Sequence, residues 1–381
     1  MNERLGELAK EFFDRVLRLC PQREIADYVV VTHLLEDRPW FLRAISGLGR
    51  IVAVIPKRKS LVPRVRDVIR HQFPLLDIAR SELETREGIT QNILPLQRDK
   101  PLCLLDVGGY FSFLTSMDLA QLNLLIAGVV EDTENGHVKY EKALDSGRCQ
   151  VPIYSVARSQ LKAPENFLVG QSLVFSVDAL LRQRDELLHG RRACVVGYGH
   201  IGRSVAHHLH ERHVDVTVFD NDPMKLVEAF THGFRTPETL REALSDAELV
   251  FCVTGNHSLG AKELSYLRPF TYVATVTSPD DELALDGVNV SISHRHGHIS
   301  ELHSADGKTI YLMNRGQAVN FVHGSVVGPF IQLLQAEILV AASTMLSENE
   351  GGHSQAARSI GSVSRAQKNQ IANTWLEVYR H

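Results

Sequence analysis

Three glycines in the spacing Gly-x-Gly-x-x-Gly carry the clearest chemical signal in the sequence. They are Gly197, Gly199 and Gly202, and an apolar run at 193–196 comes directly before them. In a strand–turn–helix unit, the first glycine permits the tight turn and the second lets a pyrophosphate approach the backbone. The third lets the helix pack closely on the strand. The spacing therefore predicts a dinucleotide site, with the pyrophosphate on the N–H groups at a helix N-terminus.

Asp220, which ends the next apolar run, indicates which dinucleotide is bound. An acid at this remove from the glycines accepts hydrogen bonds from the adenosine ribose hydroxyls. Because a carboxylate there repels a 2′-phosphate, the sequence predicts NAD rather than NADP. His200 and Ile201 begin the helix after the turn and belong to the same expected contact surface. The alternative is a fold of this type whose site is empty or altered.

A second set of polar side chains follows apolar runs in the first half of the chain. His33 follows the run 27–32, Asp106 ends the run 102–106, and Glu131 and Asp132 follow 124–130. Strands that alternate with helical patterns form a mostly parallel sheet, and its ligands gather beyond the carboxyl ends of the strands. These side chains therefore predict an active site. The alternatives are a satisfied histidine at a strand end and carboxylates that only cap the following turn.

The order of these elements predicts an α/β protein with two Rossmann-like domains, each with a parallel sheet, the second binding NAD. The expected bounds are a substrate-binding domain at 1–170, completed by 328–360, an NAD-binding domain at 171–327, and a C-terminal tail at 361–381. We expect 288–293 and 308–313 to form a final strand pair around the turn Asp306-Gly307. An amphipathic helix is expected at 329–347.

Composition excludes several classes of protein. The chain has 381 residues, 44% of them hydrophobic and 23% charged, which is ordinary for a globular protein. A net charge of −4 gives no electrostatic case for nucleic acid or an acidic membrane. No apolar run is expected to span a bilayer, and the charged N-terminus does not resemble a signal peptide. The five cysteines form no Cys-x-x-Cys pair, so we expect reduced thiols and a cytoplasmic protein.

Histidines and basic residues invite two further interpretations. His294, His296 and His298 alternate, and His207, His210 and His213 could share a helix face, yet no acidic or cysteine partner stands at ligand spacing. We therefore expect no functional metal. The basic run 57–59, with Arg64, Arg66 and Arg70, is expected to be a solvated face. The alternative is an anion site for a charged substrate.

Beyond the glycine turn, an ordered set of motifs resembles the S-adenosylhomocysteine hydrolase family over most of the chain. The set comprises Asp106-x-Gly108-Gly109, the block 131–136, Val151-Pro152 with Lys162 and Gly170 after it, Asp220-x-Asp222-Pro223, Thr254-Gly255, and the block 316–320. The resemblance implies a substrate domain, an NAD domain and a homo-oligomer, either a dimer or a tetramer. In that family, NAD oxidises a ribose 3′-hydroxyl, a thiolate leaves, water adds, and the hydride returns.

The resemblance also assigns roles to individual residues. Lys162 would be the base at the oxidised hydroxyl, while Asp132, His33 and Glu131 would be the other catalytic candidates. Asn320 would contact the nicotinamide carboxamide. The remaining expected cofactor contacts are Thr133, Thr254 and Val276.

Several positions depart from the family pattern. A second, catalytic aspartate is replaced by Val107, the lysine's aspartate partner by Asn166, and a Gly-His-Phe motif by the segment 277–279. The adenine-contacting residues become Leu35, Asp37 and Val326-Val327. We therefore expect a diverged member that retains NAD redox chemistry and Lys162 but acts on a different small molecule. The alternatives are a genuine S-adenosylhomocysteine hydrolase and a catalytically silent, NAD-holding regulatory protein.

Overall fold

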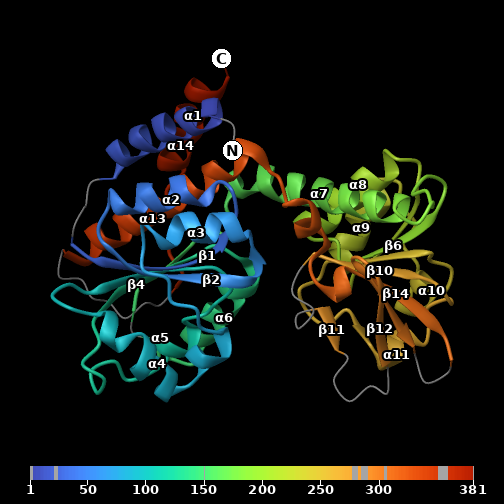
Figure 1. The fold of residues 1–381 in the computed structure, drawn as a ribbon, viewed down its shortest axis with the longest axis horizontal. Helices are drawn as coiled ribbons and strands as arrows, with labels where there is room; N and C mark the ends of the chain where they lie inside the picture. Colours follow the sequence, from blue (N-terminus) through green and yellow to red (C-terminus); the bar gives the residue numbers. More distant parts are fainter. Residues whose placement is uncertain are drawn as a thin grey trace. The chain divides into compact units, whose positions relative to one another are not determined.

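The computed structural model describes residues 3–20, 25–149, 151–276, 282–284, 291–303, 307–350 and 359–380. The chain divides into two compact units (Figure 1). Unit 1 comprises Met1–Lys162 and Pro329–His381, and unit 2 comprises Ala163–Gly328.

The division falls after Lys162, eight residues before the boundary that the sequence predicts, because helix α7 (Ala163–Arg182) packs on helix α8 (His200–His210) of unit 2. A Cβ atom added to Gly170 would lie 2.4 Å from the Ser204 Oγ, so these two helices are in close contact.

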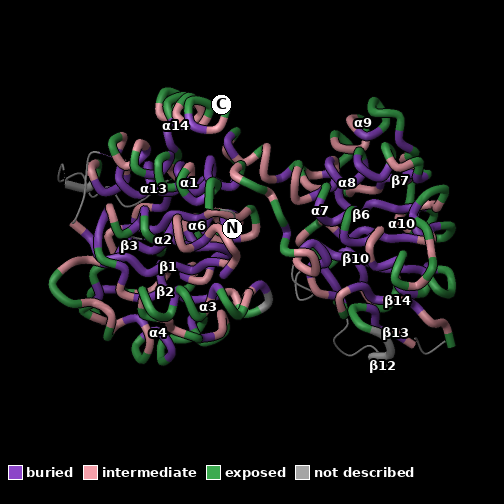
Figure 2. Tube along the Cα trace, turned by 45° about the horizontal axis from the view of Figure 1, so that its top comes forward, coloured by how far each residue is buried: buried purple, intermediate pink, exposed green. Residues whose placement is uncertain are grey.

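Unit 1 is built on a parallel sheet of five strands in the order β2-β1-β3-β4-β5. Its strands are β1 (Asp27–Leu34), β2 (Ile51–Leu61), β3 (Leu102–Asp106), β4 (Ile126–Glu131) and β5 (Ile153–Ser155). The central strands are apolar and buried, and Figure 2 shows them in purple. This is the pattern of a parallel sheet covered on both faces. Strand order reverses between β1 and β3, the position where open α/β sheets bind ligands.

Helices of unit 1 cover both faces of this sheet (Figure 1). They are α1 (Glu3–Val16), α2 (Arg38–Ser46), α3 (Pro63–Arg70), α4 (Arg86–Asn92), α5 (Ser112–Thr115), α6 (Glu134–Asp145), α13 (Ile331–Glu350) and α14 (Arg365–Tyr379). The segment predicted as a separate tail belongs to this unit, because α14 packs on α1 and α13. The rings of Phe12 and Tyr379 lie 6.2 Å apart, and the Tyr379 hydroxyl donates to the Gln332 Oε1 at 2.6 Å.

Helix α13 differs from its predicted amphipathic character. Residues 331–346 are buried except for Thr344, so the helix has no polar face open to solvent. By length and composition alone, the segment Gly328–Glu348 could span a membrane, and 83% of its apolar window is buried inside the protein. The prediction that no apolar run has this length is therefore wrong for this segment. A helix buried on all sides is typical of the centre of a core.

Unit 2 is built on a sheet of seven strands in the order β12-β13-β14-β10-β8-β6-β7. Its strands are β6 (Arg192–Val196), β7 (Asp215–Phe219), β8 (Leu249–Cys252), β10 (Tyr272–Thr275), β12 (Ser291–His296), β13 (Ile299–His303) and β14 (Thr309–Met313). From β7 to β14 all pairings are parallel. Because β6 lies between β7 and β8, the glycine turn at its carboxyl end stands at the position where strand order reverses.

The predicted final strand pair is wrong in one respect. Strand β12 does not pair with β14; both pair antiparallel with β13, which the sequence analysis did not predict. The side chains of His294 and His296 lie outside the described residues. Within the part of the chain that the structure describes, no group of three or more His, Cys, Asp or Glu residues could hold a metal ion.

Candidate active site

The glycine turn of unit 2 has the geometry that its spacing predicts. Gly197 adopts φ +100° at the end of β6, a left-handed conformation that favours glycine. Gly202 lies in the first turn of α8, after His200 and Ile201, and a Cβ there would stand 2.0 Å from the Gly197 carbonyl oxygen. At Gly199, the residue that precedes α8, an added Cβ would meet nothing within 4 Å. This open space at a helix N-terminus fits a pyrophosphate.

Asp220 lies beside this turn. Its carboxylate accepts the backbone N–H groups of Tyr198 at 2.6 Å and Asp222 at 2.9 Å, and the Lys225 Nζ lies 3.6 Å away. The carboxylate therefore holds the glycine turn against the end of β7. Because a carboxylate can accept about four hydrogen bonds, these contacts leave acceptor capacity for ribose hydroxyls.

Asn320 is buried beyond β14, in the 3-10 helix η6 (Val319–His323), and only 3% of it is exposed. Its Nδ2 donates to the Ser325 Oγ at 2.8 Å, whereas its Oδ1 has no hydrogen-bond partner among the described residues. A buried carbonyl oxygen without a donor is costly, so such an atom calls for an explanation. A carboxamide N–H of nicotinamide would satisfy it, so this side chain fits the expected cofactor.

Glu282, which the sequence analysis missed, fixes the loop after β8. It is fully buried, and its carboxylate accepts from the Thr254 Oγ at 2.8 Å, the Gly255 N–H at 2.6 Å and the Ser258 Oγ at 2.8 Å. Thr254, predicted to contact the cofactor, is therefore held by a buried acid. No motif distinguishes Glu282 from the two aspartates before it. Val276 follows β10 and is buried, while residues 277–279 lie outside the described residues.

In unit 1, the structure brings together two residues that are 30 positions apart in the sequence. Asp132 follows β4, and Lys162 ends the 3-10 helix η4 (Gln160–Lys162). The Lys162 Nζ lies 2.7 Å from the Asp132 Oδ1, and their side chains are 12% and 16% exposed. An amine and a carboxylate at this distance can exchange a proton directly. This pair is the centre of the candidate active site.

His33 lies at the end of β1, and its ring Nδ1 is hydrogen-bonded to the Ser60 Oγ on β2. Burial, together with the positive charges of Lys57, Arg38 and Lys162, lowers the pKa of His33 well below its usual value. The imidazole is therefore neutral at physiological pH and able to accept a proton. Ser60, which fixes the ring, was not predicted, because nothing in the sequence pairs it with His33.

Glu131, the other acid predicted as a catalytic candidate, ends β4. It is fully buried, and its carboxylate accepts four hydrogen bonds: from the N–H groups of Gly108 and Gly109, each at 3.0 Å, and from the N–H and hydroxyl of Thr133, each at 2.7 Å. It thus fixes the glycine turn after β3. Thr133, expected to contact the cofactor, precedes α6 in unit 1, and its Oγ accepts from the Gly136 N–H.

Asp106 is a second buried carboxylate beside Glu131. It accepts from the backbone N–H groups of Tyr110 and Phe111, each at 3.1 Å, and from the Tyr140 hydroxyl at 2.5 Å. Burial raises the pKa of Asp106, and burial with the charge of Asp106 raises the pKa of Glu131 to about 8. Both carboxylates therefore have a structural role at the carboxyl end of the sheet.

The raised pKa of Glu131 predicts that stability falls with rising pH. Its pKa rises from an ordinary 4.5 to about 8, so between these values the folded state binds more protons than the unfolded state. The free energy of unfolding should then decrease by at most about 1.4 kcal/mol per pH unit in this window. In Glu131→Gln, the pH dependence of stability that comes from Glu131 should be absent. At low pH this variant should be less stable than the unsubstituted chain, because the amide nitrogen of the new side chain would face N–H donors.

Urea unfolding at a series of pH values measures this effect. Glu84→Gln is a control, because Glu84 is a half-exposed acid of the same unit. It should leave the slope of stability against pH as in the unsubstituted chain. An unchanged slope in Glu131→Gln would show that Glu131 ionises normally in the folded protein.

The basic run that begins at Lys57 is mostly a solvated, ion-paired face. Arg58 and Arg66 contact Asp77, and Arg64 contacts Glu36, in exposed pairs. Lys57 differs, because its Nζ donates to the Val107 carbonyl oxygen at 3.1 Å.

Two departures from the family motifs have a structural explanation. The side chain of Val107 belongs to the apolar core of unit 1. Asp37 accepts from Arg38 and Gln335, each at 2.5 Å, so its Oδ2 atom is engaged within the protein.

Comparison with known proteins bears on both units. Residues 167–326 match the family model described as "S-adenosyl-L-homocysteine hydrolase, NAD binding domain". Adenosylhomocysteinase of Thermotoga maritima is 26% identical over 265 residues, which cover 68% of this chain and 65% of that enzyme. S-inosyl-L-homocysteine hydrolase of Methanopyrus kandleri is 27% identical over 248 residues, which cover 63% of this chain and 58% of the relative. The chain thus spans less than two thirds of the length of these relatives.

A solved structure also matches part of the fold. A dipicolinate synthase chain of Bacillus halodurans superposes with a TM-score of 0.43 at 11% identity, over 68% of this chain and 85% of that one. This likeness is too weak to carry an argument about function.

Proposed function

Because this chain is a diverged member of the S-adenosyl-L-homocysteine hydrolase family, with NAD as its cofactor, we propose that it is an NAD-dependent enzyme. It oxidises a secondary alcohol of a nucleoside-like or other small polar substrate. The observation that carries this proposal is the Asp132–Lys162 pair, at 2.7 Å, in a chain that also keeps the dinucleotide turn. The names of the two relatives differ in the nucleoside, which supports variation of the substrate within the family.

When bound, NAD would supply the hydride acceptor for oxidation of the alcohol. Lys162 is an ammonium beside Asp132. In the fraction of the protein in which it has lost its proton, the amine takes the hydroxyl proton: the O–H bond breaks and an N–H bond forms. Asp132 stabilises the resulting ammonium from 2.7 Å and can accept its proton. His33, held neutral, can then accept the proton from the carbon beside the ketone. The electron pair of that C–H bond would expel a leaving group from the next carbon.

Structural features of unit 1 support a substrate other than S-adenosylhomocysteine. Asp37, which stands where the family resemblance places an adenine contact, is bound by Arg38 and Gln335. Val107, in place of the second aspartate, is 7% exposed and packs in the core. The same replacement favours the second candidate function, a silent NAD-binding protein. A homo-oligomer stays a prediction.

The first experiment denatures the freshly purified protein and identifies the released small molecules by mass spectrometry, after the nicotinamide absorbance has been recorded. We expect stoichiometric NAD, partly reduced, together with a nucleoside-like or sugar-like molecule. Cleavage of S-adenosylhomocysteine at a rate ordinary for an enzyme would contradict the altered specificity. Absence of NAD, with no uptake on titration, would contradict the enzyme itself.

A further inference from the structure

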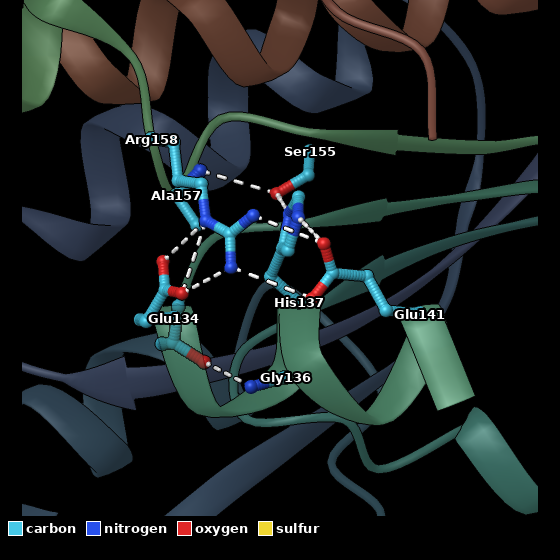
Figure 3. A network of polar contacts seen from close by, with 8 residues as sticks. Glu134, Gly136, His137, Glu141, Ser155, Ala157 and Arg158 are labelled. Carbon is cyan, nitrogen blue, oxygen red and sulfur yellow. Dashed lines mark hydrogen bonds and ion pairs between the residues drawn. The ribbon is translucent and has the colours of Figure 1, made fainter. Parts of the chain in front are cut away.

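A polar network joins helix α6 to the loop that follows β5 (Figure 3). Arg158 lies in that loop, and its Nε donates to both carboxylate oxygens of Glu134, each at 3.0 Å. Its Nη2 donates to the Glu134 Oε1 at 2.5 Å. Its Nη1 donates to the Glu141 Oε1 at 3.0 Å. Glu134 and Glu141 are seven residues apart and thus lie on one face of α6, two turns from each other. One guanidinium therefore holds the loop to two turns of the helix.

A buried branch of the network reaches the end of β5. His137, 8% exposed, contacts the Ser155 Oγ through Nδ1 at 2.9 Å and the Glu141 Oε1 through Nε2 at 3.1 Å. The Ser155 Oγ also accepts the Ala157 N–H at 3.2 Å. The strand end, the start of the loop and the helix are thus tied through one imidazole (Figure 3).

The two segments joined by this network are those that carry the Asp132–Lys162 pair. Asp132 lies two residues before Glu134, the first residue of α6. Lys162 lies four residues after Arg158, and its N–H donates to the Ser159 carbonyl oxygen at 3.1 Å, so the intervening chain is a hydrogen-bonded turn. Any movement of the loop away from α6 would therefore change the distance between the amine and the carboxylate.

We infer that Arg158, through Glu134 and Glu141, is a positioning residue that holds the Lys162 amine at the Asp132 carboxylate. The role rests on the proposed function, because it matters for a reaction in which Lys162 transfers a proton. The forked, charge-assisted contact with Glu134 gives the pairing a fixed geometry that a single ion pair lacks. The hydrogen bonds with Glu134 also raise the pKa of Arg158, so its charge is permanent.

The serine, histidine and glutamate of this network could instead form a nucleophilic relay. Ser155 is 8% exposed, and its oxygen is already the acceptor for the Ala157 N–H, which favours a bracing role. Glu141 is also engaged by Arg158 rather than by His137 alone. Labelling of Ser155 by a fluorophosphonate probe would overturn the bracing role, and no labelling is the expected result.

The test measures the chemical environment of Lys162 directly in the full NAD-loaded chain. A pulse of acetic anhydride acetylates amines in proportion to their neutral, accessible fraction, and mass spectrometry follows Lys162 across a pH series. We expect Arg158→Gln to increase acetylation of Lys162 about tenfold, since the loss of a positioning contact releases the pair. Arg158→Lys keeps the charge without the fork and should lie in between. Glu134→Gln should resemble Arg158→Gln.

Two internal comparisons make this test specific. Lys142, exposed on α6, should react equally in every variant. Arg80→Gln removes a half-exposed ion pair elsewhere in unit 1 and should leave Lys162 unchanged. Equal acetylation of Lys162 in Arg158→Gln and in the unsubstituted chain would overturn the inference.

Turnover provides the second readout. Once the substrate is identified, Arg158→Gln should lower kcat about tenfold and shift its pH profile, with little change in KM. A protein that oxidises no substrate would contradict the proposed function alone, because the acetylation pattern is measured without turnover. An unchanged kcat and pH profile in a redox-active chain would overturn the positioning role alone.

Discussion

Replacement of Lys162 by Ala is expected to lower NAD-dependent oxidation by about three orders of magnitude while NAD stays bound. General bases typically contribute about 10²–10⁴-fold to rate, and Lys162 is the amine in contact with Asp132 in the candidate site. The dinucleotide turn belongs to unit 2, whereas Lys162 belongs to unit 1, so the cofactor contacts at the turn are retained. Reduction of nicotinamide by the co-purified molecule, followed by absorbance, measures the effect.

Two variants separate the loss of a base from a general disturbance. Lys162→Arg keeps a positive charge near Asp132 but cannot release a proton at working pH, so it should be as inactive as Lys162→Ala. Lys142→Ala removes an exposed lysine of the same unit and should retain full turnover. Retention of oxidation by both Lys162 variants would rule out this lysine as the base. Asp132→Asn should also reduce turnover, because it removes the carboxylate partner.

Two alanine substitutions in the glycine turn are expected to differ in their effect on the stability of the fold. Gly199→Ala should fold with nearly unchanged stability, because its added Cβ meets no protein atom within 4 Å. That space is where the pyrophosphate is expected, so NAD affinity should fall about 100-fold, a loss of about 2.7 kcal/mol. Gly202→Ala places its Cβ 2.0 Å from the Gly197 oxygen. It should destabilise unit 2 by about 1–3 kcal/mol as well as weaken NAD binding.

Thermal unfolding without cofactor and calorimetric titration with NAD distinguish the two effects. Each substitution adds one methyl group, so each serves as the matched control for the other. Normal NAD affinity in Gly199→Ala would show that the pyrophosphate does not lie at this helix N-terminus. Equal loss of stability in both variants would contradict the packing that assigns the two glycines different roles.

Local sequence patterns were sufficient to predict many of the individual strands and the dinucleotide-binding turn. The runs 27–32, 102–106 and 193–196 became strands, since apolar runs of this length bounded by turn residues fit a buried parallel sheet. The turn could be predicted because each glycine serves a local backbone requirement. The predicted pair β12–β14 failed, since the intervening β13 is short and Glu301 interrupts its apolar pattern.

Side-chain roles at strand ends could be predicted only in part. Spacing placed Glu131 and Asp132 together at the end of β4, but it could not show which carboxylate is buried. In the structure, the Glu131 carboxylate is buried and accepts four hydrogen bonds, whereas the Asp132 carboxylate contacts Lys162. The two differ because successive side chains point to opposite sides of the backbone. Glu282 and Ser60 were missed for a related reason: their partners are distant in sequence.

The sequence by itself determined the two α/β units, the NAD turn at 197–202 and the resemblance to the S-adenosylhomocysteine hydrolase family, because these depend on local backbone geometry and on ordered motifs. Only the tertiary structure decided that Lys162 meets Asp132, that Ser60 fixes His33, and that Arg158 joins its loop to α6. The physical reason is that a hydrogen bond or ion pair forms between atoms within about 3 Å of each other. Parallel strands bring such atoms to one edge of a sheet from positions far apart in the chain.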